Sequence, residues 1–184
     1  MREKRQYRIE GDLLWREWRV RVGLKQAFPP SAAADARLLI LGSLPGEESL
    51  RQQRYYAHPT NAFWWLIGEV IGETVVRLPY EDRLDRLKTH RIALWDVIER
   101  AKRLGSLDQA IQSAEPRDLA GFAASLPDLR AIAFNGGTAA RHGRQQLGGT
   151  DCYTLIDLPS SSAAYAGMHR DAKRERWMAL RAFL

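Results

Sequence analysis

Short apolar runs recur along the chain, and longer amphipathic stretches separate them. The runs cover residues 37–41, 91–97, 130–134 and 152–158, and most of their apolar residues are consecutive. Consecutive apolar residues are typical of strands that are buried on both faces, as in a parallel sheet. The pattern therefore predicts four buried strands.

Helices are predicted between these strands from capping residues and apolar spacing. Thr60 suits the N-cap of a helix that runs to Ile71, and Gly72 is its expected stop. Further helices are expected to begin at Pro79, Ser106, Pro116, Thr138 and about Asp171. Strands that alternate with helices predict an α/β fold, a three-layer α/β/α sandwich with a central four-stranded parallel sheet.

The beginning of the chain does not follow this alternation. Apolar residues within 14–22 have helical spacing. Trp18, Val20 and Val22 also alternate with arginines, as they would in a strand. We interpret residues 1–30 as an N-terminal arm, either helical or irregular.

The length of 184 residues suits a single domain, residues 1–184, with a sizeable core. No run reaches the roughly 20 apolar residues of a membrane span, and no apolar segment of a secretory signal follows the charged start. Cys152 is the only cysteine, which excludes a disulfide within the chain and a zinc or iron–sulfur site built from cysteines. We expect a monomer in the reducing cytoplasm, without membrane contact.

The charge of the chain favours a polyanionic partner. The formal net charge is +6, and residues 1–26 carry eight Lys/Arg against four Asp/Glu, while residues 165–184 carry five against two. A basic face on a terminal helix is predicted, formed by Arg170, Lys173, Arg174, Arg176 and Arg181. An ordinary solvated helix surface would have the same pattern. Nucleic acid is therefore the leading partner if the chain also contains a binding site.

Small and polar residues follow each predicted strand. These residues are Gly42-Ser43-Leu44-Pro45-Gly46, then Trp95-Asp96, then Asn135-Gly136-Gly137, and finally Pro159-Ser160-Ser161-Ser162. The carboxyl ends of parallel strands meet at one edge of the sheet, where ligands bind in this class of fold. We therefore expect the four sets to form one shared site.

The residue types at this edge limit the chemistry. The glycine loop matches neither a phosphate-binding Walker loop nor a dinucleotide fingerprint, and no Gly-x-Ser-x-Gly elbow is present. The four histidines lack metal-ligand spacing, so we expect no metal and no cofactor. Amides, hydroxyls, one carboxylate and the nearby aromatic residues suit a planar ligand rich in hydrogen-bonding groups, such as a nucleobase.

Seven segments in order resemble the hypoxanthine-DNA glycosylases, a branch of the uracil-DNA glycosylase superfamily. The segments are LILGSLPGEESL, YYAHPTNAFW, LPYEDRL, ALWDVI, GSLDQAI, AFNGGTAAR and LPSSSAAYAGM. The resemblance implies an enzyme that flips a deaminated base out of DNA and hydrolyses its N-glycosidic bond, with hypoxanthine as the favoured base. The transition state resembles an oxocarbenium ion, so an amide that orients water suffices and no cofactor is needed.

The resemblance also assigns roles to residues near the glycine loop. Most of the superfamily positions the catalytic water with an Asp or Asn where this chain has Ser43, and the hypoxanthine branch uses the amide that is here Asn61. Gly42 belongs to the backbone floor under the base. Tyr56 falls where relatives stack an aromatic ring on the flipped base, and Asp96 falls where they read its edge. The alternatives are helix capping for Asn61, core packing for Tyr56, and a helix cap or a partner of Arg100 for Asp96.

The later segments supply further contacts in this comparison. Asn135 is expected to contact the base, sugar or water, although an Asn-Gly pair is also typical of turns. Ser160, Ser161 and Ser162 match a loop that holds DNA phosphates, and Tyr165 or Met168 is the expected wedge. Relatives begin this loop with His or Asn, whereas Leu158 stands there in this chain.

Three other functions stay open from the sequence. Within the same superfamily, the enzyme could excise uracil or mismatched thymine. The replacement of the usual Asp/Asn by Ser43 also fits a non-catalytic module that binds DNA lesions. An α/β enzyme for free nucleosides would not need the basic ends of the chain.

Overall fold

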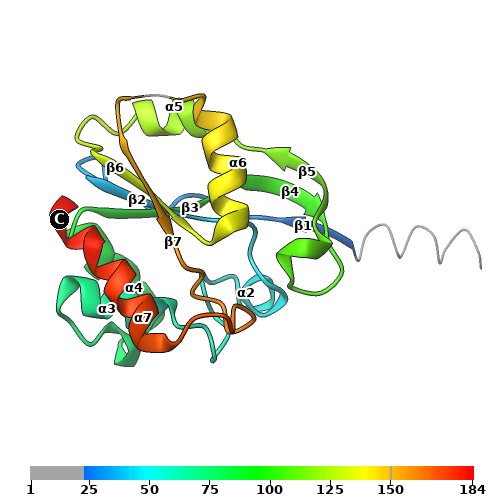
Figure 1. The fold of residues 1–184 in the computed structure, drawn as a ribbon, viewed down its shortest axis with the longest axis horizontal. Helices are drawn as coiled ribbons and strands as arrows, with labels where there is room; N and C mark the ends of the chain where they lie inside the picture. Colours follow the sequence, from blue (N-terminus) through cyan, green and yellow to red (C-terminus); the bar gives the residue numbers. More distant parts are fainter. Residues whose placement is uncertain (1–22, 150) are drawn as a thin grey trace, which may run out of the picture.

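The computed structural model describes residues 23–149 and 151–184, and the predicted four-stranded parallel sheet forms its centre (Figure 1). The strand order is β3-β2-β6-β7. The strands are β2 (Leu38–Gly42), β3 (Ile92–Asp96), β6 (Ala131–Asn135) and β7 (Thr154–Leu158). All neighbouring pairs are parallel, so the predicted sheet is confirmed.

Helices cover both faces of this sheet, which confirms the three-layer arrangement (Figure 1). One face packs against α3 (Phe63–Ile71), α4 (Tyr80–Thr89) and α7 (Arg170–Trp177), and the other against α5 (Leu119–Ala124) and α6 (Gly137–Leu147). Shorter helices are α2 (Glu47–Gln52) and the 3-10 turns η1 (Val75–Arg77), η2 (Asp108–Ala110) and η3 (Met178–Phe183).

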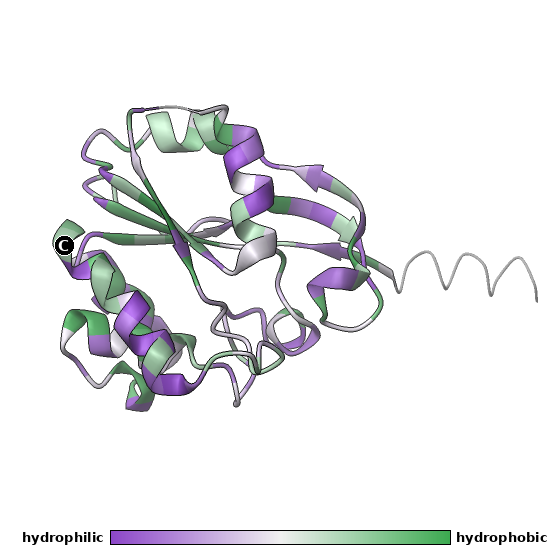
Figure 2. Cartoon of the chain, in the orientation of Figure 1, coloured by the Kyte–Doolittle hydropathy of each residue, from purple (hydrophilic) through white to green (hydrophobic). Residues whose placement is uncertain are grey.

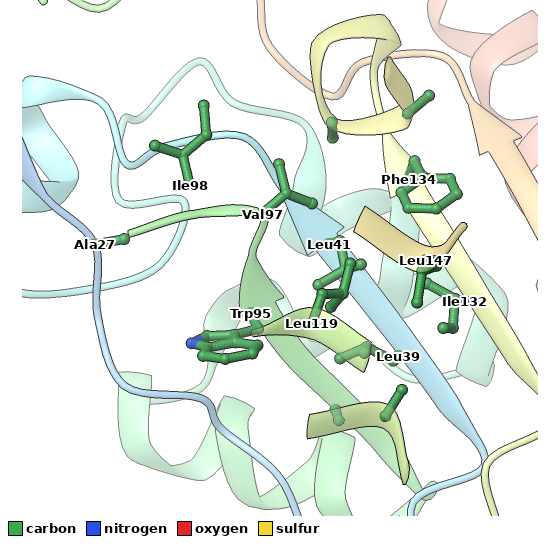
Figure 3. Packing of buried hydrophobic residues seen from close by; sticks show 14 of the residues in the cluster. Ala27, Leu39, Leu41, Trp95, Val97, Ile98, Leu119, Ile132, Phe134 and Leu147 are labelled. Atoms are coloured by element: carbon green, nitrogen blue, oxygen red, sulfur yellow. The ribbon is translucent and has the colours of Figure 1, made fainter. Parts of the chain in front are cut away.

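The side chains of β2 explain why the sheet needs two covering layers. Leu39 and Leu41 point to the face of α5 and α6, where Figure 3 shows them near Leu119 and Leu147. Leu38 and Ile40 lie in the opposite cluster, because successive side chains of a strand alternate between faces. Figure 2 shows the central strands as predominantly hydrophobic, whereas hydrophilic residues lie on α6 and α7. Consecutive apolar residues thus supply two cores at once.

A second, antiparallel sheet was not predicted. It has the order β1-β4-β5 and consists of β1 (Leu24–Gln26), β4 (Ile98–Lys102) and β5 (Gln112–Pro116). Its strands are short and mostly exposed, and the register of β4 against β5 shifts twice. Such irregular strands have no clear alternation of apolar and polar residues, so the sequence pattern did not indicate them.

Several predicted helix starts were wrong. The helix expected from Ser106 is the turn η2, and Pro116 ends β5 instead of opening a helix. The helix expected from Thr60 begins at Phe63. The Thr60 hydroxyl contacts His58 Nδ1 at 2.9 Å and therefore does not cap the helix.

The described end of the expected N-terminal arm belongs to the packed structure. Residues 24–26 form β1, and Phe28 is buried with its ring 5.3 Å from the ring of Tyr55. The expectations for residues 14–22 lie outside the described residues. In the described part of the chain, no helix has the length and apolar character needed to cross a membrane.

Candidate active site

The carboxyl ends of the four parallel strands meet at one edge of the sheet. Gly42 at the end of β2 is level with Asp96 at the end of β3. Asn135 at the end of β6 is level with Leu158 at the end of β7. This edge brings residues from distant parts of the sequence together, and parallel α/β sheets bind their ligands here.

A hollow with a volume of about 840 Å³ opens beside this edge. Its lining residues come from three parts of the chain, within the segments 52–65, 76–83 and 161–173. The lining contains five of the predicted site residues, Tyr56, Asn61, Ser161, Tyr165 and Met168. The other predicted site residues lie outside this lining, and they are Gly42, Ser43, Asp96, Asn135, Ser160 and Ser162.

The side chains of Asp96 and Tyr56 converge over Gly42. A Cβ atom at Gly42 would lie 2.5 Å from Asp96 Oδ1 and 3.1 Å from the Tyr56 hydroxyl. Both Asp96 Oδ2 and the Tyr56 hydroxyl are buried, and among the described residues Asp96 Oδ2 has no hydrogen-bond partner. The Asn135 side chain is within hydrogen-bonding reach of the Tyr56 hydroxyl. A buried polar atom without a partner costs roughly 1–3 kcal/mol. The Asp96 oxygen therefore marks a point where a ligand or an ordered water would find a hydrogen-bonding partner.

Burial changes the protonation of both groups. It raises the pKa of the Asp96 carboxyl to about 7, even though Arg117 and Arg103 favour the ionised form. Burial and the neighbouring Asp96 also raise the pKa of Tyr56, while the Asn135 side chain opposes this shift. Near neutral pH, Tyr56 is therefore a hydroxyl donor, and Asp96 exchanges between an acceptor and a donor.

Gly42→Ala is expected to destabilise the protein by about 1–3 kcal/mol, because the added methyl group would overlap the buried Asp96 carboxyl. It should also abolish ligand binding at this point. Chemical denaturation measures the first effect. Gly137→Ala is the matched control, since a Cβ there meets no atom within 4 Å. Equal stability of the two variants would contradict the tight contact at Gly42.

The ring of Tyr56 is held in place by α3. It stacks on the ring of Phe63, with 3.8 Å between centroids and 13° between planes. Tyr56 has a φ of 52°, which is uncommon for a residue other than glycine. Such backbone conformations concentrate at functional sites, where the surrounding structure enforces them. Stacking and backbone together direct the Tyr56 hydroxyl toward Gly42.

Asn61 precedes α3 and contributes to its beginning. The Phe63 N–H donates to Asn61 Oδ1 at 3.0 Å, and the Asn61 N–H donates to the carbonyl of His58 at 2.9 Å. Asn61 is not the N-cap of α3, which is Ala62 without a side-chain cap, so the alternative capping role is wrong. Its bond to the Phe63 N–H is instead a local turn just before the helix. Its amide oxygen has a second lone pair, and its side chain lines the hollow, so a water can still bind to it.

Asn135 joins the end of β6 to the loop that contains Ser160, Ser161 and Ser162, which we call the serine loop. Its Nδ2 donates to Ser161 Oγ at 2.9 Å, and the Ser161 N–H donates to Asn135 Oδ1 at 2.8 Å. The Ser161 carbonyl in turn accepts from the Ala62 N–H at 3.0 Å. Asn135 thereby fixes the distance between the serine loop and the start of α3, both of which line the hollow.

The rest of the serine loop is braced mainly by Lys173, which was predicted only as part of a basic face. The Lys173 ammonium donates to the carbonyls of Ser162 and Tyr165 at 3.3 and 2.9 Å, and burial lowers its pKa. Within the loop, Ser160 Oγ accepts from the Ser162 N–H at 3.2 Å. Tyr165 is 43% exposed and so remains accessible to a ligand.

The predicted basic face on α7 is mostly occupied with α3. Arg174 pairs with Glu69 at 2.6 Å, and Arg181 donates to the carbonyls of Val70 and Glu69. The Arg170 guanidinium lies 3.7 Å from the centre of the Trp65 ring. These arginines therefore fix α7 against α3, a use that a helical charge pattern does not reveal.

Ser43 belongs to the glycine loop but lies outside the hollow. Its carbonyl accepts from the Ile98 N–H at 3.1 Å, which connects the loop to the start of β4. The buried Arg103 guanidinium donates to the carbonyls of Leu44 and Pro45. The strand β4 and the residue that follows it thus stabilise the glycine loop by hydrogen bonds to the backbone of the loop.

The lining also includes polar and aromatic residues that the sequence analysis did not assign to the site, among them Arg54, Tyr80 and Arg83. Only the LPYEDRL segment of the family resemblance could have indicated the last two. Among the described residues, no group of three His, Cys, Asp or Glu side chains is placed to hold a metal ion.

Comparison with known proteins identifies the family. The sequence pattern of the uracil DNA glycosylase superfamily matches residues 29–182. The chain belongs to this superfamily. A protein of Methanosarcina acetivorans named hypoxanthine DNA glycosylase is 41% identical over 157 residues, which are 85% of this chain and 98% of the relative. One of Methanosarcina barkeri with the same name is 43% identical over 112 residues, or 61% and 71% of the two chains.

A solved structure supports the same assignment. The solution NMR structure of a proposed uracil DNA glycosylase from Methanosarcina acetivorans superimposes with a TM-score of 0.76 at 38% identity. The match covers 87% of this chain and 98% of the other. The edge of the sheet with Gly42, Asp96 and Asn135 is thus the candidate active site of a uracil DNA glycosylase superfamily member.

Proposed function

We propose that the chain is a DNA glycosylase that removes hypoxanthine from DNA by hydrolysing its N-glycosidic bond. The observation that carries the proposal is the convergence over Gly42 of two buried groups, the Tyr56 hydroxyl and the Asp96 carboxyl with its unpartnered Oδ2. Two relatives named hypoxanthine DNA glycosylase, at 41% and 43% identity, support the choice of base.

The base-binding role of Asp96 follows from the edge of hypoxanthine. That edge presents N1–H as a donor and O6 as an acceptor. The ionised Asp96 carboxylate accepts from N1–H, whereas the protonated form donates to O6. The Tyr56 hydroxyl is a second hydrogen-bonding group at the same point. Tyr56 also lines the hollow into which the base would be flipped.

The hydrolysis requires a water on the sugar and a stabilised leaving base. Asn61 supplies the first, because its amide oxygen retains a lone pair beside the hollow. The groups over Gly42 supply hydrogen bonds to the departing base, whose negative charge grows in the transition state. A catalytic role for the Ser43 hydroxyl stays a prediction.

The proposed substrate is DNA that contains a deaminated base, bound by the serine loop. Ser160, Ser161 and Ser162 would contact phosphates, and Tyr165 or Met168 would fill the gap left by the flipped base. Asn135 acts on the substrate through the loop that it holds, with the base as a further possible contact. We further propose that the protein acts as a monomer. A cytoplasmic location is also part of the proposal, and the single cysteine favours it.

A strand-cleavage assay tests this function. The protein is incubated with oligonucleotides that carry hypoxanthine, xanthine, uracil or a G·T mismatch, and alkali then cleaves any abasic site. We expect the fastest cleavage on hypoxanthine. Preferred cleavage at uracil or mismatched thymine would instead support the other glycosylase activities of the superfamily. Binding without cleavage of any substrate would identify a lesion-binding module.

A further inference from the structure

The lining of the hollow contains a further group of residues, which we call its second end. The group consists of Arg54, Tyr80 and Arg83, from the segment that precedes Tyr56 and from α4. The Trp64 ring packs edge-on against both Phe63 and Tyr80, and Phe63 in turn stacks on Tyr56. None of the three residues at the second end takes part in the base chemistry described above.

Aromatic rings fix the position of this second end. The Tyr80 ring packs edge-on against Trp64, with 6.0 Å between centroids, and its hydroxyl accepts from the Tyr55 N–H at 2.8 Å. The Arg54 guanidinium lies 5.3 Å from the centre of the Tyr80 ring. The Arg83 guanidinium lies 5.5 Å from the centre of the Trp64 ring. Both cations are therefore placed against rigid surfaces.

In the described part of the chain, the two arginines at this end, Arg54 and Arg83, form no direct ion pairs, although the Glu81 charge acts on the nearby Tyr80. Arg83 donates to the carbonyls of Leu78 and Val76, and its pKa is lowered by burial and by the nearby Arg54 charge. Two neighbouring arginines at a concave surface favour an anion between them.

We propose that Arg54 and Arg83 bind a backbone phosphate of the lesion strand, next to the flipped nucleotide. The inference rests on the proposed function, because the strand that leaves the base site must follow the same hollow. The Arg54 guanidinium lies over the Tyr80 ring, and contacts through Trp64 and Phe63 connect this ring to Tyr56, whose hydroxyl faces Gly42. Arg83 is held by two carbonyls and supplies a fixed charge, whereas the exposed Arg54 supplies the bidentate contact.

This contact would complement the serine loop. Residues of the serine loop also line the hollow, so under this proposal the lesion strand is held on both sides of the flipped nucleotide. Holding both sides keeps the glycosidic bond at a constant position relative to Asn61. The second end therefore contributes to substrate positioning without touching the reacting atoms.

The test compares Arg54→Ala and Arg54→Glu with Arg86→Ala. Arg86 is a matched control because it is an exposed arginine of α4 that pairs with Glu73 at 3.4 Å and lies outside the hollow. Binding to a 20-base-pair duplex with a stable abasic analogue is measured by fluorescence anisotropy at several salt concentrations. We expect Arg54→Ala to weaken binding roughly fivefold and to reduce the log–log salt slope by about 1. Arg54→Glu should weaken binding further, and Arg86→Ala should match the unmodified protein.

Kinetics on hypoxanthine DNA provide a second readout. Arg54→Ala should raise KM with little change in kcat, because the contact is remote from the reacting bond. The assay is repeated on two shortened oligonucleotides, which end immediately 5′ or 3′ of the lesion. On the one that lacks the phosphate bound by Arg54, the KM of Arg54→Ala should equal that of the unmodified protein. Arg54 variants that behave like Arg86→Ala in both assays would overturn the inference. Failure of the unmodified protein to excise hypoxanthine would instead refute the proposed function, while the binding comparison would still test the phosphate site.

Discussion

Asn61→Ala is expected to lower kcat for hypoxanthine excision by roughly 10²- to 10⁴-fold, the range typical of a lost group that positions or activates water. Asn61 is the amide that lines the hollow and retains a free lone pair beside the expected position of the sugar. Affinity for DNA should change little, because the phosphate contacts are elsewhere. Single-turnover kinetics with saturating enzyme separate the chemical step from binding and product release.

The control for this experiment separates catalysis from the hydrogen bond to the Phe63 N–H. Asn61 Oδ1 accepts from the Phe63 N–H just before the helix, so Asn61→Ala also costs about 1 kcal/mol of stability through this lost hydrogen bond. Asn61→Ser keeps an oxygen that can accept from this N–H, but its side chain is too short to hold a water at the sugar. It should recover most of the stability and none of the rate. Rapid excision by Asn61→Ser or Asn61→Ala would assign Asn61 to this structural hydrogen bond alone.

Asp96→Asn is expected to change which bases are excised. The buried carboxyl has a pKa of about 7 and can accept from hypoxanthine N1–H or donate to O6, whereas an amide presents one fixed donor group and one fixed acceptor. The ratio of kcat/KM for hypoxanthine to that for uracil should fall by roughly 10- to 100-fold. Affinity for undamaged DNA is the control and should stay constant. Unchanged substrate ratios would remove Asp96 from base recognition.

The same variant should alter the pH dependence of stability. The folded-state pKa of Asp96 is raised from 3.8 to about 7, so the folded protein binds more protons than the unfolded chain between these values. This contribution to stability is complete below about pH 4 and is lost as the pH rises through about 7. The free energy of unfolding of Asp96→Asn, relative to that of the unmodified protein, should therefore rise by roughly 2–4 kcal/mol between pH 5 and pH 8.

Urea denaturation at pH 5 and pH 8 measures this difference. Asp85→Asn is the control, because the Asp85 side chain is 71% exposed and far less sensitive to burial. A stability difference between Asp96→Asn and the unmodified protein that does not vary with pH would show that the carboxyl is ionised throughout. Protonation of Asp96 would then play no part in base recognition.

The fold prediction succeeded for the central strands, whose consecutive apolar residues are buried on both faces of the sheet. The β2 residues Leu38 to Leu41 are all buried, and a run of this kind is compatible with little else than an interior strand. The small sheet was missed because β1 pairs with β4 across more than 70 residues of sequence. Pairing at that distance leaves no local pattern when the strands are short and exposed.

For the site, the positions of residues at the strand ends were predictable, but contacts that depend on loops were not. Strand ends at one edge placed Gly42, Asp96 and Asn135 together, as the parallel order requires. The reciprocal bonds between Asn135 and Ser161 were not predictable, since they depend on the path of a loop. Nor was the burial of Lys173, whose charge appeared in the sequence only as part of a basic helix.

The sequence by itself determined the parallel sheet, the edge that carries the site and the residue types available there. These follow from short-range periodicity and from the geometry of parallel strands. Only the tertiary structure decided which polar groups lack partners. Whether Asp96 Oδ2 is bonded or free depends on every atom packed around it, and no local pattern contains that information. For the same reason, the phosphate site at Arg54 and Arg83 became visible only in three dimensions.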